Sequence, residues 1–192
     1  MNVLRYWAGY ALSWMRFRVR ALCPGRRVLV KNDRVQTSPL YADVCLWQKT
    51  QMDSMTFEND RPLKSNKGAV DLGLMRRIHR RTLLEIRHEL GDLWRPSSVT
   101  LDRGRGISLD QSIAIMHRLR DAGFPDDSLG VVSVEFSGRR HSFAIVHDRP
   151  DDFWVLDNGM LSFCPVRGSV LLAARRDVGV LIGFNFFDVW NY

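Results

Sequence analysis

Three residues whose types suit acyl-transfer chemistry, Ser108, His141 and Asp157, stand at the predicted start of a helix and on two predicted neighbouring strands. Acyl-transfer sites place a nucleophile within hydrogen-bond reach of a base, and a third group orients that base. At a helix N-terminus, the helix dipole and the backbone N–H groups favour negative charge that develops during the reaction. The sequence therefore predicts one site in which Ser108 faces His141, with Asp157 behind it.

The hairpin predicted between the strands of His141 and Asp157 indicates how these two residues lie. If His147 faces Asp152 across a short loop, His141 falls one position from directly opposite Asp157. We therefore expect the two side chains to be cross-strand neighbours.

Each of the three residues also has a purely structural explanation. Ser108 with Gln111 three residues later has the pattern of a helix capping box. His141 follows two arginines at the start of a strand, where an exposed turn residue is common, and residues 157–159 form a good turn sequence. These three residues alone do not distinguish the structural roles from a catalytic site, whereas a longer sequence pattern can.

The elements that would position the site follow from hydrophobic periodicity. Apolar residues at helical spacing predict a helix, or a broken pair of helices, over residues 69–94, and a loop then leads to Gly104. A second helix runs from Ser108 to Gly123. Strand-like runs follow over Val131–Phe136, His141–His147, Phe153–Asp157, Met160–Val166 and Val178–Phe187. The predicted fold class is α+β, with N-terminal helices followed by an antiparallel sheet.

Residues 1–24 predict an amphipathic helix that precedes this domain. At helical spacing the arginines fall mainly on one face, and an aromatic stripe lies opposite, formed by Trp7, Tyr10, Trp14 and Phe17. The apolar run of about ten residues is too short to span a bilayer. The pattern is typical of a helix in a membrane interface or docked on a partner, and equally of one packed on its own core. We expect an extended connector at 25–68 and one domain at 69–192.

Composition limits the classes of partner. The chain has 192 residues, a net charge of +7 and a pI of about 9.8, which suits an anionic partner such as a membrane surface. No RNP-like, zinc-finger or recognition-helix pattern accompanies the charge, so nucleic acid is not an expected partner. The three cysteines are far apart in the sequence and form no C-x-x-C motif, which predicts neither a zinc site nor a disulfide framework. Membrane-associated, periplasmic and virion locations all stay open.

A longer pattern resembles a known family. Its parts are Leu90–Pro96, Leu101–Gly106, residues 108–114, His141 and Trp154–Asn158, and together they resemble the bacterial transglutaminase-like cysteine proteinases over roughly residues 75–165. Characterised members cleave surface adhesins in the periplasm. The resemblance implies a papain-like, transglutaminase-type fold with a Cys-His-Asp triad. His141 and Asp157 match the base and its orienting carboxylate, and Ser108 matches the cysteine.

The departures from the family pattern concern both the nucleophile and the metal. The acidic residues that bind calcium in characterised members are matched here by Ile107 and Leu109, and only Asp110 remains. One carboxylate falls well short of the six to eight oxygens that calcium takes, so we expect no metal site and no cofactor. An engineered replacement of the cysteine would explain Ser108 but neither Ile107 nor Leu109.

The serine leaves three hypotheses about function. The favoured one is a catalytically inactive homologue that serves as a binding or structural module for a protein partner or a larger assembly, attached through residues 1–24. The alternative is an active peptidase or amide hydrolase with a Ser108-His141-Asp157 triad, in which the histidine removes the serine proton during attack. The third is a component of a bacteriophage virion or ejection apparatus.

Overall fold

The computed structural model describes residues 44, 46–48, 70–91, 94–95, 97–136, 139–149, 152–159, 164–169, 178–186 and 188–190. The amphipathic helix expected at 1–24 lies outside these residues, as does most of the connector expected at 25–68. Among the helices that the structure describes, none combines the length and the apolar character needed to cross a bilayer.

The first long helix, α3, spans Leu72–Glu85. Asp71 caps it, because its carboxylate accepts a hydrogen bond from the backbone N–H of Leu74 at 2.9 Å. The buried face consists of Met75, His79 and Thr82, and a row of arginines faces outward on the opposite side.

The helix expected up to residue 94 is wrong beyond Glu85. Ile86 has extended backbone angles, and Arg87–His88 form the short strand β1, which pairs in parallel with β2 at Arg105–Gly106. The N–H of Arg87 donates to the carbonyl of Gly104 at 2.9 Å. This pairing with a distant segment overrides the helical spacing of the apolar residues.

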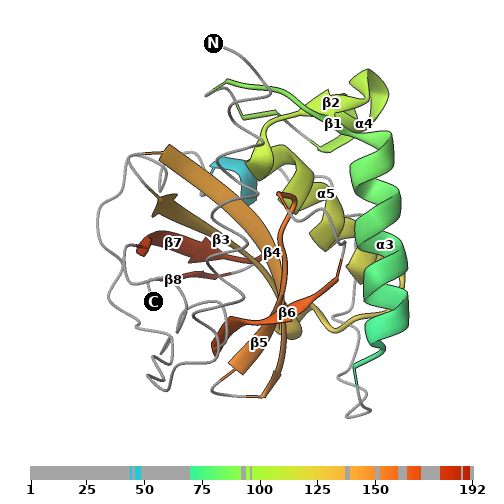
Figure 1. Cartoon of the computed structure of the whole chain (residues 1–192), viewed down its shortest axis with the longest axis vertical. Coiled ribbons are helices and arrows are strands. Elements are labelled where there is room, and N and C mark those ends of the chain that lie inside the picture. Colours follow the sequence, from blue (N-terminus) through green and yellow to red (C-terminus); the bar gives the residue numbers. More distant parts are fainter. Residues whose placement is uncertain are drawn as a thin grey trace.

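A short helix, α4, occupies Ser97–Arg103, where the sequence predicted a loop. The helix ends at Arg103, and the following Gly104 has a φ of +60°, in the left-handed region that favours glycine. Helix α4 and the β1–β2 pair therefore form a small subassembly beside the N-terminus of the next helix (Figure 1).

The second long helix, α5, spans Ser108–Asp121 and lies between the sheet and α3 (Figure 1). Every residue from Leu109 to Met116 is buried, as expected of a helix covered on both sides. Asp110 stands in its first turn, and Arg118 and Arg120 stand in its last, which complements the helix dipole.

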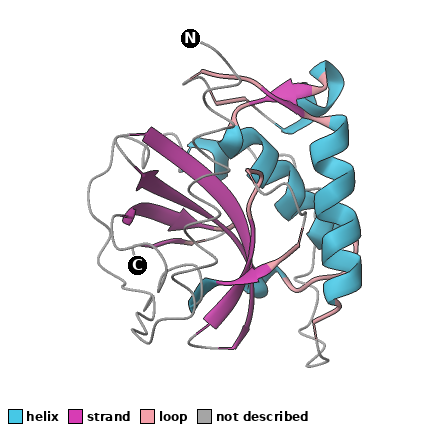
Figure 2. Cartoon of the chain, viewed as in Figure 1, coloured by secondary structure: helices cyan, strands magenta, loops and turns pink. Residues whose placement is uncertain are grey.

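The described residues form a sheet of six antiparallel strands, in the order β6-β5-β4-β3-β7-β8. A 3-10 turn at Asp126–Ser128 leads into it. Helices α3 and α5 lie on one side of the sheet (Figure 2). This arrangement confirms the predicted α+β class. The strand bounds are β3 Leu129–Phe136, β4 Arg139–Arg149, β5 Asp152–Leu156, β6 Val166–Arg167, β7 Val178–Phe184 and β8 Val189–Trp190.

Residues near position 47 belong to the core of this domain. Val44 and Leu46–Gln48 are helical, so the extended connector expected there is wrong at these positions. Trp47 is only 6% exposed and packs against the rings of Trp94, Phe184 and Phe186, with centroids 5.5–5.9 Å away. Gln48 donates a side-chain hydrogen bond to the carbonyl of Asn185 at 3.0 Å. The core therefore begins well before residue 69.

Below pH 6.5, His117 is expected to make the fold less stable. Burial lowers the pKa of His117 from 6.5 to about 4, and its ring packs edge-on against Phe186. The unfolded chain binds a proton on His117 more readily than the folded protein does. The contribution of neutral His117 to the free energy of unfolding is therefore fully present above pH 6.5 and is lost as the pH drops toward 4. The shift corresponds to a loss of about 3 kcal/mol.

The measurement is urea unfolding of the wild type and of His117→Phe between pH 4 and 7.5. The difference in unfolding free energy between the two proteins should not vary above pH 7 and should change between pH 6.5 and 4. A constant difference across the whole range would contradict the expectation.

Candidate active site

Ser108 is the first residue of α5, and Ile107 is its N-cap. The carboxylate of Asp110 accepts from the backbone N–H of Ile107 at 3.1 Å, which forms one half of a capping box. The capping box expected between Ser108 and Gln111 is therefore wrong. Gln111 instead donates its side-chain amide to the carbonyl of Ile86 at 2.8 Å.

The Ser108 hydroxyl contacts the strand that carries His141. Its Oγ accepts a hydrogen bond from the backbone N–H of Ser142 at 3.3 Å. Ser142 is itself fixed, because its hydroxyl shares a buried 2.7 Å hydrogen bond with Ser133 on β3. The N-terminus of α5 therefore packs against β4 directly beside position 141.

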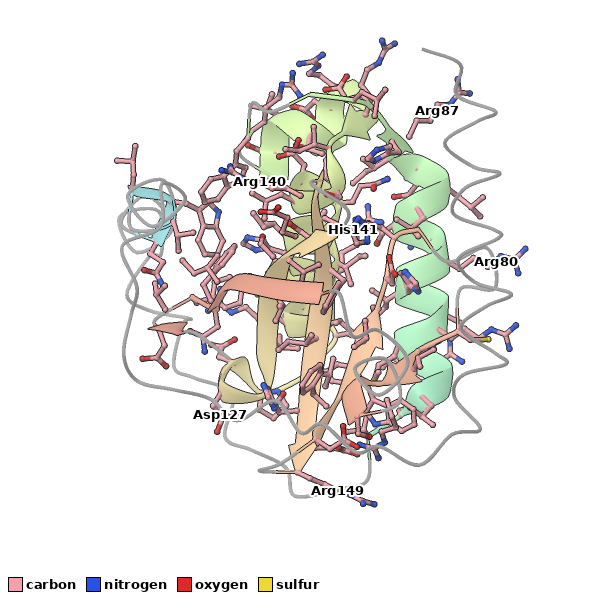
Figure 3. All side chains as sticks on the ribbon, turned by 60° about the vertical axis from the view of Figure 1, so that its left-hand side comes forward. Arg80, Arg87, Asp127, Arg140, His141 and Arg149 are labelled. Carbon is pink, nitrogen blue, oxygen red and sulfur yellow. The ribbon has the colours of Figure 1, made fainter. Side chains whose placement is uncertain are left out.

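His141 and Asp157 form a direct pair. The His141 Nε2 and the Asp157 Oδ1 are 2.7 Å apart, and the same oxygen accepts the backbone N–H of Gly159 at 2.8 Å. Asp157 is only 3% exposed, and the His141 side chain is 14% exposed. His141 lies near the start of β4, at the end opposite Arg149 (Figure 3).

The hairpin that produces this pair differs from the predicted register by one residue. His147 pairs with Phe153 instead of Asp152, because a bulge lies between His147 and Arg149. His141 and Asp157 are nevertheless neighbours across the hairpin, as expected.

Asn158 ties the turn after β5 to α5. Its Nδ2 donates to the backbone carbonyl of Ser108 at 2.7 Å and lies 3.4 Å from the Ser112 hydroxyl. Residues 157–159 therefore form a turn and also hold the start of α5, so their structural and positioning roles coexist.

The chemistry available to this group follows from the histidine tautomer. A neutral imidazole that donates its Nε2–H to Asp157 carries its lone pair on Nδ1. Nδ1 is then the atom that could accept a proton, and Asp157 would stabilise the charge that results.

His88 is a further residue of this region that the sequence reasoning missed. It pairs in register with Gly106, two residues before Ser108. Burial lowers the pKa of His88, a hydrogen bond to Gln111 opposes this effect, and the charge of neighbouring His141 adds to it. A helix over residues 69–94 would not pair His88 with Gly106, so the predicted elements gave no signal for His88.

Arg95, Glu89 and Asp110 form a polar cluster behind the first turn of α5. The backbone N–H of Arg95 donates to Asp110 Oδ1 at 2.9 Å, and its guanidinium lies 3.8 Å from Asp110 Oδ2 and pairs closely with Glu89. Burial raises the pKa of Asp110, and the hydrogen bonds from Arg95 and Ile107 oppose this rise. Gly106 is required beside this cluster, because a Cβ there would stand 2.8 Å from the Asp110 Cβ.

These residues do not fit the calcium site of the resembled family. Leu109 belongs to the hydrophobic core and Ile107 packs against it. Both oxygens of Asp110 accept backbone N–H groups, and an arginine lies next to them. In the part of the chain that the structure describes, no group of three metal-ligating side chains occurs.

Replacing Arg95 with methionine is expected to destabilise the protein by about 2 kcal/mol at pH 7, because two carboxylates lose the cation beside them. The loss should be smaller at pH 4 than at pH 7, because burial raises the pKa of Asp110 and its protonated carboxyl no longer needs the cation. Chemical unfolding at both pH values measures it, and calcium chloride should not restore the lost stability.

The matched control is Arg81→Met. Arg81 forms an exposed pair with Glu85 at 2.7 Å, and because solvent screens such a pair its loss should change the stability little. Equal losses from the Arg95 and Arg81 variants would argue against a special role for the cluster.

Comparison with known proteins gives a match at the level of structure. No protein-family model matches the chain, and no curated protein matches its sequence. Among solved structures, Legionella pneumophila LapG is similar with a TM-score of 0.55 and 17% identity, covering 77% of this chain and 87% of that chain. The EGTA-treated LapG structure has a TM-score of 0.55, with 84% of its chain covered, and the calcium-bound structure has 0.54 with 87% covered. The chain has the transglutaminase-like α+β fold of LapG.

Proposed function

We propose that the chain is a catalytically inactive protein with a transglutaminase-like fold, and that it binds a polypeptide partner at the surface around Ser108 and His141. The observation that carries this proposal is the hydrogen bond from Ser142 N–H to the Ser108 Oγ. It engages a lone pair of the oxygen that would have to attack a carbonyl carbon.

The difference between serine and cysteine supports the same proposal. A thiol at a helix N-terminus beside a histidine ionises readily, so a cysteine site holds a nucleophile before the substrate arrives. A serine hydroxyl stays protonated, and its reactivity depends wholly on proton transfer during attack. An N–H donor on its oxygen further weakens that reactivity.

A working hydrolase is the second candidate, and the 2.7 Å contact between His141 and Asp157 favours it. Ser108 Oγ would bond to the carbonyl carbon of a peptide or amide while His141 takes the hydroxyl proton. His141 would return that proton to the nitrogen as the C–N bond breaks, and water would then hydrolyse the ester. The backbone N–H of Ser108, in the first turn of α5, would stabilise the oxyanion.

A serine-directed fluorophosphonate probe separates the two candidates. For the proposed binding protein we expect no covalent labelling of Ser108 in the folded wild type, measured by mass spectrometry of the digest. Labelling that disappears in His141→Ala would overturn the proposal in favour of the hydrolase. Labelling that persists in that variant would not depend on the base, and the proposal would stand.

Attachment of the protein to a membrane or an assembly through residues 1–24 stays a prediction from the sequence. That segment lies outside the described residues, so the proposal concerns only the surface around Ser108.

A further inference from the structure

Two arginines lie side by side at the edge of the site. Arg87 on β1 and Arg105 on β2 are direct partners in the parallel register, and both are exposed. Like charges directly opposite each other on neighbouring strands destabilise the pair. Among the described residues, no carboxylate forms an ion pair with either guanidinium. An anionic ligand that bridged the two guanidinium groups would relieve this repulsion.

Arg105 lies close to Ser108 in the sequence, and its strand β2 contacts helix α5. Arg105 precedes Ser108 by three residues, and the next pair in the same register is His88 with Gly106. Exposed Arg140 directly precedes His141, although it lies opposite Glu135 on β3. Arg87 and Arg140 lie toward the same end of the molecule, away from Arg149 (Figure 3). A ligand held by Arg87 and Arg105 would therefore lie on the β1–β2 pair, beside the start of α5.

Apolar side chains in the same region indicate what kind of anion fits. Leu90, two residues beyond β1, is 65% exposed, and Leu101 on α4 is 41% exposed. Helix α4 and the β1 segment are in contact, because Arg103 lies 3.8 Å from Glu89. Carboxylates pair well with arginine forks, and leucines suit a polypeptide with apolar residues better than they suit a sugar-phosphate backbone.

We infer that the surface around Ser108 takes an acidic polypeptide segment, whose carboxylates pair with Arg87 and Arg105 and whose apolar residues contact Leu90 and Leu101. This inference rests on the proposed binding function and names the class of partner.

The test measures binding of a fluorescein-labelled peptide of alternating glutamate and leucine residues by fluorescence anisotropy at physiological salt. The comparison ligands are a lysine-leucine peptide, a single-stranded oligonucleotide and phosphatidylserine vesicles. The test variant is Arg87→Glu with Arg105→Glu. The control is Arg76→Glu with Arg80→Glu, which makes the same charge change at exposed positions on α3. A milder variant, Arg87→Gln with Arg105→Gln, covers the case in which the charge reversal impairs folding.

We expect the wild type to bind the acidic peptide more tightly than the other ligands. The Arg87 and Arg105 variants should lose about tenfold in affinity or more, as the removal of charge-assisted hydrogen bonds predicts, and the α3 control should lose much less. Equal losses of affinity from both charge reversals would show that net charge alone determines the binding, and would overturn the inference. Tighter binding of the oligonucleotide or the vesicles would overturn it too. Neither result would alter the fluorophosphonate outcome, so the inference can fail while the proposed lack of catalysis stands.

Discussion

Ser108→Cys is expected to place a thiol at the start of α5 with a pKa several units below the value of about 8.5 for free cysteine. Three features favour the thiolate there: the helix N-terminus, the backbone N–H of Ser142, and the His141 imidazolium that Asp157 would stabilise. Thiolate absorbance at 240 nm, titrated against pH with the wild type subtracted, measures the shift. Site-resolved alkylation followed by mass spectrometry gives a second readout, with Cys164 in the same digest as the internal reference.

The dependence on His141 is the informative part of this experiment. In the double variant Ser108→Cys with His141→Ala, the pKa of the introduced thiol should rise by several units, because only the helix terminus and one N–H group remain to stabilise the anion. An introduced thiol that titrates near 8.5 when His141 is present would show that the imidazole does not reach position 108. Ser108 and His141 would then not belong to one site, and both candidate functions depend on that site.

Trp47→Ala is expected to lower the free energy of unfolding by about 3–5 kcal/mol, the usual cost of removing a large buried aromatic side chain. The indole is 6% exposed and contacts rings from the segment after α3, from α5 and from the C-terminal region. Its loss would leave a cavity lined by Trp94, His117, Phe184 and Phe186. Equilibrium unfolding in urea measures the loss.

Leu46→Ala provides the matched control for Trp47→Ala. Leu46 is the preceding residue and is 66% exposed, so its truncation should change stability by about 0.5 kcal/mol or less. A loss below about 1 kcal/mol for Trp47→Ala would contradict the placement of this segment in the core.

The sequence predicted best those elements whose signal is local. The helix that begins at Ser108 and the strands of His141 and Asp157 have uninterrupted apolar patterns, and a short hairpin limits how far their register can shift. The transglutaminase-like fold, expected from the order of several motifs, is confirmed by the structural similarity to LapG.

The features that the sequence did not predict depend on distant partners. Residues 86–88 leave the helical state because their backbone pairs with residues 104–106, and no short window contains both segments. Trp47 stands in a stretch without periodicity, and its burial depends on rings at positions 184 and 186. The ion-pair role of Arg95 likewise requires Glu89 and Asp110, which are far apart in the sequence, to lie beside the same side chain.

Strand β7 supplies none of the three candidate catalytic residues, yet it pairs along β3 from Val131 to Phe136. A shortened protein that ended after Gly159 would keep Ser108, His141 and Asp157 but would uncover the hydrogen-bonding edge of β3. Such an edge recruits strands from other molecules. Minimal versions of this domain would therefore self-associate unless β7 were kept, because β7 occupies the edge of β3 that would otherwise pair with another molecule.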